Sequence, residues 1–262
     1  MMINQYDLDK DIVFLAKSEI RLKILSELQK KPNSIKELVT NTKITYSSIS
    51  SNLTKLEEHN HITKKKNKFY LNPLSKIYYE NLMEFKLSID LIENLNDLWD
   101  KHNIDQLSLD SIQNITALEK SKLVETTPLD IYKTHNTIKD NMVKTKNVKA
   151  IFPYLHPEYP QLLENILRNE GNVELIIPKN MFRGIIFEIN EKIRKSAARK
   201  GRLKVYTTQN DLKLYLALCD KTMSLGLFKN DESFDQNRIL ISSSKESLKW
   251  ANDLFTNVKE KM

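Results

Sequence analysis

The chain has 262 residues, of which 40% are hydrophobic and 29% charged, and its formal net charge is +7. This length suggests two modest domains rather than one. No apolar run approaches the ~20 residues that span a bilayer, and the polar, acidic N-terminus is unlike a signal peptide. We therefore expect a cytoplasmic protein without a membrane partner. The single cysteine, Cys219, excludes an internal disulfide and fits a reducing compartment.

The charge is distributed unevenly along the sequence. Residues 1–75 carry a net charge of +5, residues 76–103 carry −3, and residues 104–262 carry +5. Basic segments of this kind are compatible with attraction to phosphate, although charge alone does not establish a nucleic-acid partner.

Three helices are predicted near the N-terminus. Residues 18–28 place apolar side chains at helical spacing, so one stripe of this segment faces a core. Pro32 then breaks the chain, and Ser34 with Glu37 has the pattern of a capping box that opens a second helix. After a short turn, Thr45 is the expected cap of a third helix.

The third helix carries two contrasting faces. Ile49, Leu53 and Leu56 recur at i, i+4 and i+7, so they point toward a core. The opposite face holds small hydroxyl side chains, which allow a helix to approach a DNA groove closely and to bond phosphates or base edges. A solvated helix face is the alternative interpretation. The candidate DNA-contacting residues here are Thr45, Tyr46, Ser47, Ser48, Ser51 and Lys55.

A basic hairpin follows this helix. Residues 62–63 and 69–71 alternate like two short strands around a lysine-rich tip. In a winged helix-turn-helix such a tip lies beside the DNA backbone, where lysines displace condensed counterions. A solvated basic hairpin is again the alternative. The candidate backbone-contacting residues are Lys64, Lys65, Lys66 and Lys68.

The order helix, turn, helix and hairpin over residues 34–73 is typical of the winged helix-turn-helix, whose second helix enters the major groove. Together with SxxRxxIL from Ser18, this pattern resembles archaeal and bacterial winged-helix regulators of the arsenical-resistance-regulator type. The resemblance covers about the first seventy residues. It implies that residues 1–73 form a domain that binds double-stranded DNA.

Residues 74–103 are predicted to form a linking helix. No Gly or Pro follows Pro73 before residue 101, and a stripe at spacings of three and four is interrupted by polar Asn96. Such a stripe favours a seam between two subunits, and hence a homodimer, because dimeric helix-turn-helix proteins read paired half-sites. Packing of the helix against the chain's own domains is the alternative. The stripe consists of Tyr78, Leu82, Phe85, Ile89, Ile92 and Trp99.

Strand-like and helix-like segments alternate over residues 104–262. Residues 111–122 mix helix and loop. Helices are predicted at 129–143, 159–170, 181–200 and 245–261, and strands at 123–125, 148–152, 173–177, 203–207, 212–218 and 223–228. This alternation predicts an α/β sandwich on a mixed sheet, so the whole chain belongs to the α+β class.

The C-terminal half also resembles a known family. The residues that carry the resemblance are His156-Pro157-Glu158-Tyr159, DKTMSLGLF from Asp220, Phe234-Asp235, LIS at 240–242, Trp250 and Leu254-Phe255. They resemble the middle domain of archaeal methanogenesis regulators over residues 123–257. The sequence departs from that family at two places. The family prefers Gly-Tyr-Asp where this chain has Ser233-Phe234-Asp235, and Gly where this chain has Ala251. The resemblance implies a transcription factor with a regulatory domain over residues 104–262, without identifying an effector.

No enzymatic motif is found in the sequence. GxSxG, the Walker loop, GxGxxG and HExxH are missing, and no histidine is followed two residues later by lysine, as phospholipase D chemistry requires. Cys219 lies on a predicted apolar strand and is expected to be a core residue. His59 and His61 are expected to pack or to lie on the surface rather than to bind metal. We therefore expect no catalytic residue, no metal and no cofactor.

Effector contacts are expected near the predicted strand ends. A ligand pocket needs a few convergent polar groups on apolar walls, and each candidate is also compatible with packing or surface exposure. The candidates are Tyr154, His156, Tyr159, Arg183, Thr207 and Tyr215. A second basic run over residues 192–204 is compatible with anion or DNA binding, with a solvated helix face as the alternative.

The sequence as a whole predicts a dimeric, sequence-specific transcriptional regulator with an unidentified small-molecule or protein effector. Two rivals remain open at this stage. One is a constitutive DNA-binding protein whose C-terminal domain only dimerises. The other is a DNA-tethered enzyme of phosphodiesterase type, against which the missing motifs argue.

Overall fold

The computed structural model describes residues 10–262 of the chain. These residues divide into two compact units, residues 10–89 and residues 90–262, with the boundary inside one helix. Within residues 10–262, no helix is both long and apolar enough to cross a membrane.

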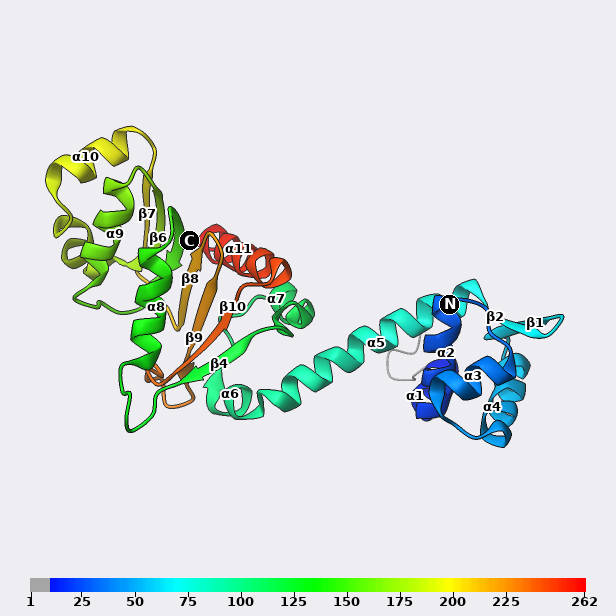
Figure 1. The fold of residues 1–262 in the computed structure, drawn as a ribbon. Coiled ribbons are helices and arrows are strands. Elements are labelled where there is room, and N and C mark those ends of the chain that lie inside the picture. Colours follow the sequence, from blue (N-terminus) through cyan, green and yellow to red (C-terminus); the bar gives the residue numbers. More distant parts are fainter. Residues whose placement is uncertain (1–9) are drawn as a thin grey trace, which may run out of the picture. The chain divides into compact units, whose positions relative to one another are not determined.

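The first unit is a winged helix-turn-helix (Figure 1). Its elements are α1 (Lys10–Ala16), α2 (Glu19–Lys30), α3 (Ile35–Thr42), α4 (Tyr46–Glu58), β1 (Ile62–Lys65), β2 (Lys68–Leu71) and the start of α5 (Pro73–Asn94). The sequence did not predict α1. The capping box predicted for α3 is confirmed, because Ser34 Oγ accepts from the backbone N–H of Glu37 at 3.4 Å and Glu37 Oε2 accepts from that of Ser34 at 2.7 Å.

One apolar core holds this unit together. The buried faces of α2, α3 and α4 meet between the helices, and Leu15 of α1 and Phe69 of β2 close the core from two sides. Burying a large aliphatic side chain stabilises a fold by about 1.5–3 kcal/mol. The three buried residues predicted for α4, namely Ile49, Leu53 and Leu56, all lie in this core, so the opposite face of α4 is left to solvent.

The linking segment is not a single helix, so the prediction of one helix over residues 74–103 is wrong: the helix breaks at Leu95, and residues 102–103 form a strand. Helix α5 ends at Asn94, and α6 (Asn96–Lys101) begins one residue later. Leu95 has φ −115 and ψ 25, and its side chain packs with Leu91 and Leu98 against the core of the second unit. The flanking asparagines are weak helix formers, which makes this position the easiest place to break the helix.

The second unit is built on a mixed sheet in the order β4-β10-β9-β8-β5-β6-β7, with β3 beside β9. β5, β6 and β7 run parallel, whereas the other neighbours are antiparallel. The strands are β3 (His102–Asn103), β4 (Lys122–Glu125), β5 (Asn147–Ile151), β6 (Asn172–Pro178), β7 (Leu203–Thr208), β8 (Leu214–Cys219), β9 (Met223–Lys229) and β10 (Arg238–Ser242).

Helices cover both faces of this sheet, so the unit has three layers (Figure 1). One face carries α8 (Lys133–Val143), α9 (Tyr159–Arg168) and α10 (Glu191–Arg199), and the other carries α7 (Leu109–Gln113), the 3₁₀ turn Ile115–Leu118 and α11 (Lys245–Glu260). The predicted α+β class, with a winged helix-turn-helix and an α/β sandwich, is confirmed.

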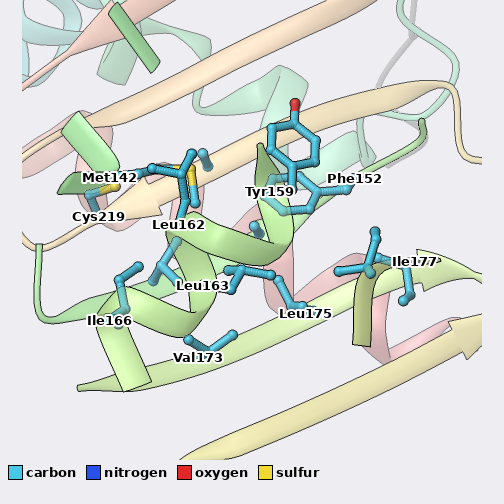
Figure 2. Close-up of a cluster of buried hydrophobic side chains, with 14 of the residues drawn as sticks. Met142, Phe152, Tyr159, Leu162, Leu163, Ile166, Val173, Leu175, Ile177 and Cys219 are labelled. Atoms are coloured by element: carbon cyan, nitrogen blue, oxygen red, sulfur yellow. The ribbon is translucent and has the colours of Figure 1, made fainter. Parts of the chain in front are cut away.

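Strand alternation assigns side chains to the two cores. Successive residues of a strand point to opposite faces, so Tyr215, Ala217 and Cys219 of β8 face α8 and α9, whereas Leu214 and Leu216 face α11. Figure 2 shows the first of these cores, where Cys219 lies near Met142. Burial raises the pKa of the Cys219 thiol to about 12, so this side chain is a neutral core residue.

Two predicted helices begin later than expected. Residues 129–132 precede α8 because Thr127 Oγ1 accepts from the backbone N–H of Asp130 and holds a turn there. The predicted helix over 181–200 is wrong. A 3₁₀ turn (Lys179–Met181) and a π-helical turn (Arg183–Phe187) come first, and Asn190 then caps α10 by accepting from the backbone N–H of Lys192.

Several residues of the C-terminal motif hold the layers together. Asp235 Oδ2 lies 2.9 Å from His102 Nε2, and both side chains are buried. His102 Nδ1 lies 2.7 Å from the carbonyl oxygen of Leu98 in α6. On the α11 side, the indole N–H of Trp250 donates to the carbonyl oxygen of Ser111 at 2.8 Å. These motif residues therefore act as scaffold.

Candidate nucleic-acid interface and effector cavity

Helix α4 exposes a polar face opposite its buried stripe. Thr45 Oγ1 accepts from the backbone N–H of Ser48 at 3.4 Å and starts the helix, as predicted. The turn before it is made by Lys43, whose φ of 56 ends α3 in the left-handed region. Tyr46 is 57% exposed, and Ser47, Ser51, Thr54 and Lys55 are also exposed.

Ser48 differs from the other predicted residues of this helix. It is half-buried, and its Oγ accepts from Thr45 Oγ1 at 3.0 Å. Its carbonyl oxygen also accepts from the side chain of Asn52. Ser48 is thus engaged within the helix start, whereas the exposed hydroxyls of Ser47 and Ser51 lie on the solvent face.

The hairpin of β1 and β2 presents its lysines to solvent. Ile62 pairs with Leu71 and Lys65 with Lys68, which leaves a tight turn in which Lys66 has φ 54. Lys64, Lys65, Lys66 and Lys68 are all exposed. The ammonium groups of Lys64 and Lys65 lie 5.6 and 5.7 Å from the rings of Phe69 and Tyr70, distances at which a cation–π attraction operates.

A buried asparagine fixes this wing to the helices, which the sequence did not reveal. Asn33 and Phe69 exchange two backbone hydrogen bonds, at 2.8 and 3.3 Å, and so add a third extended segment beside β2. The side-chain amide of Asn33 donates to the carbonyl oxygens of Glu27 and Lys31. Pro32 indicates a helix break next to Asn33, but nothing local in the sequence indicates that Asn33 pairs with Phe69.

A cavity of about 340 Å³ opens beside Tyr154 and His156 in the second unit. The hydroxyl of Tyr154 accepts from that of Tyr159 at 2.9 Å, and burial raises the pKa of Tyr154. The cavity is lined by Ile131, Tyr132, Thr134, His135, Ile138, Tyr154, Leu155, His156, Phe234, Gln236, Asn237 and Ile239.

Four of the six predicted effector residues cluster in space. Tyr159 and Tyr215 are fully buried behind Tyr154, with ring centroids 5.9 and 6.1 Å from it. Arg183 and Thr207 are exposed and do not line this cavity.

His135 is a polar residue of the cavity that sequence reasoning missed. Its ring stacks on that of His156 at 3.9 Å, and its Nε2 lies 2.5 Å from Glu158 Oε2. Lys139 donates to the other carboxylate oxygen at 2.6 Å. Lys139, followed by His135, lowers the pKa of Glu158 to about 2. No local motif links His135 on α8 to His156, so only the fold brings these groups together.

Two arginines of the second basic run, residues 192–204, make contacts within the second unit. Arg194 donates to the carbonyl oxygen of Ile186, and its guanidinium carbon lies 4.4 Å from the centroid of the Phe187 ring. Arg202 donates to the carbonyl oxygens of Leu167 and Gly171. These contacts favour a structural role for both arginines.

Comparison with known proteins assigns the family. Residues 9–92 match the N-terminal domain of the methanogenesis regulatory protein FilR1, and residues 131–261, half of the chain, match its middle domain. The chain belongs to the FilR1 family. The predicted resemblance to methanogenesis regulators is thereby confirmed. The FilR1 protein of Methanothrix harundinacea (strain 6Ac) is 23% identical over 268 residues, and the match covers 97% of this chain but 57% of that protein.

Solved structures give weaker matches to this FilR1-family chain. TrmBL2, described as an archaeal chromatin protein with a novel mode of DNA binding, aligns with 12% identity and a TM-score of 0.42, covering 95% of this chain and 97% of its own. The S-adenosylmethionine-dependent methyltransferase SibL aligns with 11% identity and a TM-score of 0.26, and the match covers 76% of this chain and 62% of SibL. The family assignment rests on the two domain matches.

Proposed function

We propose that this chain is a DNA-binding transcriptional regulator whose second unit receives a signal. The observation that carries the proposal is the exposed hydroxyl face of α4 beside a lysine-tipped wing within one compact unit. Membership of a family named for a regulatory protein supports it.

The two parts of this surface have different roles in the proposal. Ser47, Ser51 and Lys55 on α4 lie where side chains of a recognition helix reach base edges in the major groove. The wing lysines contact the phosphate backbone, which supplies affinity and orientation but little sequence information. In this proposal Tyr46, which is exposed at the start of α4, contacts the edge of the groove.

Replacing Ser51 with glutamate tests the role of α4. A carboxylate about 4 Å from a phosphate is disfavoured by about 1 kcal/mol even in water, so we expect at least about fivefold weaker binding of the full chain to duplex DNA. Fluorescence anisotropy on labelled genomic fragments measures this change. Ser243→Glu adds the same charge at an exposed serine of the second unit and should leave the affinity unchanged. If Ser51→Glu and Ser243→Glu bound DNA with equal affinity, the exposed face of α4 would not be the DNA-contacting surface.

The cavity beside Tyr154 is the proposed site of signal input. It combines apolar walls with tyrosine, histidine and amide groups, which is the composition expected of a small-molecule site. The stacked histidines and the side-chain amides of Gln236 and Asn237 give it both donors and acceptors. A C-terminal domain that only dimerises would need no such cavity, so this feature favours a sensing role over constitutive binding.

Helix α5 provides the proposed route from the second unit to the first. Tyr79 near its start lies in the core of the winged helix, and Leu91 near its end lies in the core under the sheet. A change in the second unit is therefore proposed to pass through α5 to the spacing of two recognition helices. A ligand that altered DNA affinity without altering that spacing would contradict this mechanism.

A homodimer is proposed to form along the exposed side of α5. Phe85, Ile89 and Ile92 are 64%, 37% and 42% exposed and recur at i, i+4 and i+7, the spacing of a helix-to-helix seam. Tyr78 and Leu82 of the predicted stripe instead pack on the core of the first unit, and Trp99 packs on that of the second.

Replacing Phe85 with glutamate should convert the proposed dimer to a monomer, because a charge would be buried in the seam without a partner. Sedimentation equilibrium of the full chain measures the mass at micromolar concentration. Asn94→Glu, at an exposed polar position nine residues later and therefore on the opposite side of α5, is the matched control and should weaken association less. A wild-type chain that remains monomeric throughout would contradict the seam.

A further inference from the structure

Three side chains with metal-binding chemistry converge in the first unit. Asp11 lies on α1, His59 caps the end of α4, and His61 precedes β1. Asp11 Oδ1 is 3.6 Å from His59 Nδ1 and 3.8 Å from His61 Nε2, and the three ligand atoms all lie within 4.8 Å of one another.

His61 is oriented as a ligand by its own surroundings. Its side chain is only 2% exposed, and its Nδ1 lies 2.9 Å from Ser75 Oγ. When that nitrogen carries the proton and donates to the serine hydroxyl, Nε2 keeps a free lone pair. Within residues 10–262, Nε2 has no hydrogen-bond partner. Leaving a buried polar atom without a partner costs folding free energy. A ligand that binds His61 Nε2 would remove this cost.

The separations of the three ligand atoms are close to those around one shared ion. The rings of His59 and His61 are nearly parallel, at 4°, with centroids 6.2 Å apart, and Phe14 stacks on both. A tetrahedral zinc ion with bonds of about 2.0–2.1 Å holds its ligand atoms about 3.3 Å apart. The two measured separations from Asp11 need to shorten by only a few tenths of an ångström to reach that value.

From this geometry we infer that Asp11, His59 and His61 bind a divalent transition-metal ion, with zinc as the best match. Two imidazoles and one carboxylate are a ligand set that zinc accepts, and water would complete the tetrahedron. Ser75 fixes the tautomer of His61, as outer-shell partners commonly do for metal-bound histidines.

The second histidine cluster is less suited to a metal. There, His135 Nε2 is already hydrogen-bonded to Glu158, whose other oxygen accepts from the Lys139 ammonium. A metal ion would have to displace this cation and break both bonds. In the first unit, by contrast, the Nε2 atom of buried His61 has no such bond to lose.

The inferred ion would join three elements that determine the shape of the winged helix. It would tie α1 to the end of α4 and to the residue before β1, and Ser75 extends the contact to α5. An effect of metal on DNA affinity rests on the function proposed above. Metal binding itself does not, so it can be measured without DNA.

Titration of the full metal-free chain with zinc tests the inference, with cobalt as a spectroscopic probe. We expect one equivalent bound with an affinity lowered more than about 100-fold by Asp11→Asn or His59→Ala, because even outer-shell changes cost 10–100-fold. Ser75→Ala should lower the affinity for zinc by a factor within that 10–100-fold range. Cobalt should give the intense visible absorption of a four-coordinate site.

His156→Ala is the matched control, because it removes a histidine from the other cluster and should leave the affinity unchanged. His59 is 43% exposed, so its replacement spares the core, and circular dichroism confirms that the variants remain folded. A chain that binds no zinc would overturn the inference. Binding that His156→Ala abolishes and His59→Ala spares would also overturn it.

Discussion

Replacing Lys64, Lys65 and Lys66 together with alanine is expected to weaken duplex DNA binding about 500-fold at 0.1 M salt. Each lysine that neutralises a phosphate contributes about 0.9 to the slope of log affinity against log salt, so three contacts amount to a slope change of about 2.7. All three side chains are exposed at the tip of the wing. The cation–π contacts of Lys64 and Lys65 are exposed and contribute only about 0.5–1 kcal/mol each, so the variant should remain folded.

Binding isotherms at several salt concentrations measure this slope directly. Lys144, Lys245 and Lys249 are exposed lysines of the second unit, and their joint replacement with alanine removes the same charge. This control should change the slope far less than the wing variant does. Equal slopes in the wing variant and the wild type would show that the wing does not contact the backbone.

Replacing Asp235 with alanine is expected to destabilise the second unit by about 3–5 kcal/mol, the usual result of removing one partner from a buried pair. The change would leave buried His102 without the carboxylate that now lies 2.9 Å from its Nε2. It would also remove the acceptor for the backbone N–H of Asn237. The loop after β9 and the strand after α6 would then lose their shared anchor.

Urea unfolding followed by tryptophan fluorescence measures this loss selectively, because both tryptophans, Trp99 and Trp250, lie in the second unit. Asp235→Asn keeps an acceptor oxygen, so it should lower the free energy of unfolding by less than the alanine variant does. Asp140→Ala, at an exposed position, should stay within about 0.5 kcal/mol of the wild type. An unchanged midpoint for Asp235→Ala would show that the pair does not hold the layers.

Local signals predicted much of the fold. Ser34 with Glu37 and Thr45 begin helices as the sequence indicated, because a cap is a contact between residues three apart. Short apolar runs such as residues 173–177 likewise placed the central strands, because a strand that is buried on both faces is apolar along most of its length. The failed helix over 181–200 contains its own start signal at Asn190, which the apolar pattern around it obscured.

Contacts between distant residues were beyond the sequence pattern. Asp235 and His102 are 133 positions apart, and the pairing of Asn33 with Phe69 links a helix break to the wing. The sites show the same division. The exposed face of α4 followed from its buried stripe, whereas His135 and Asp11 join their clusters only through tertiary packing.

Selection from the chain's own genome tests the central claim most directly. The purified chain would be bound to sheared genomic DNA, and the retained fragments would be sequenced. A dimeric regulator predicts enrichment of a short inverted repeat near promoters, because paired recognition helices read paired half-sites. Retention without a common site would contradict sequence-specific regulation, and no retention at modest salt would contradict DNA binding by the winged helix altogether.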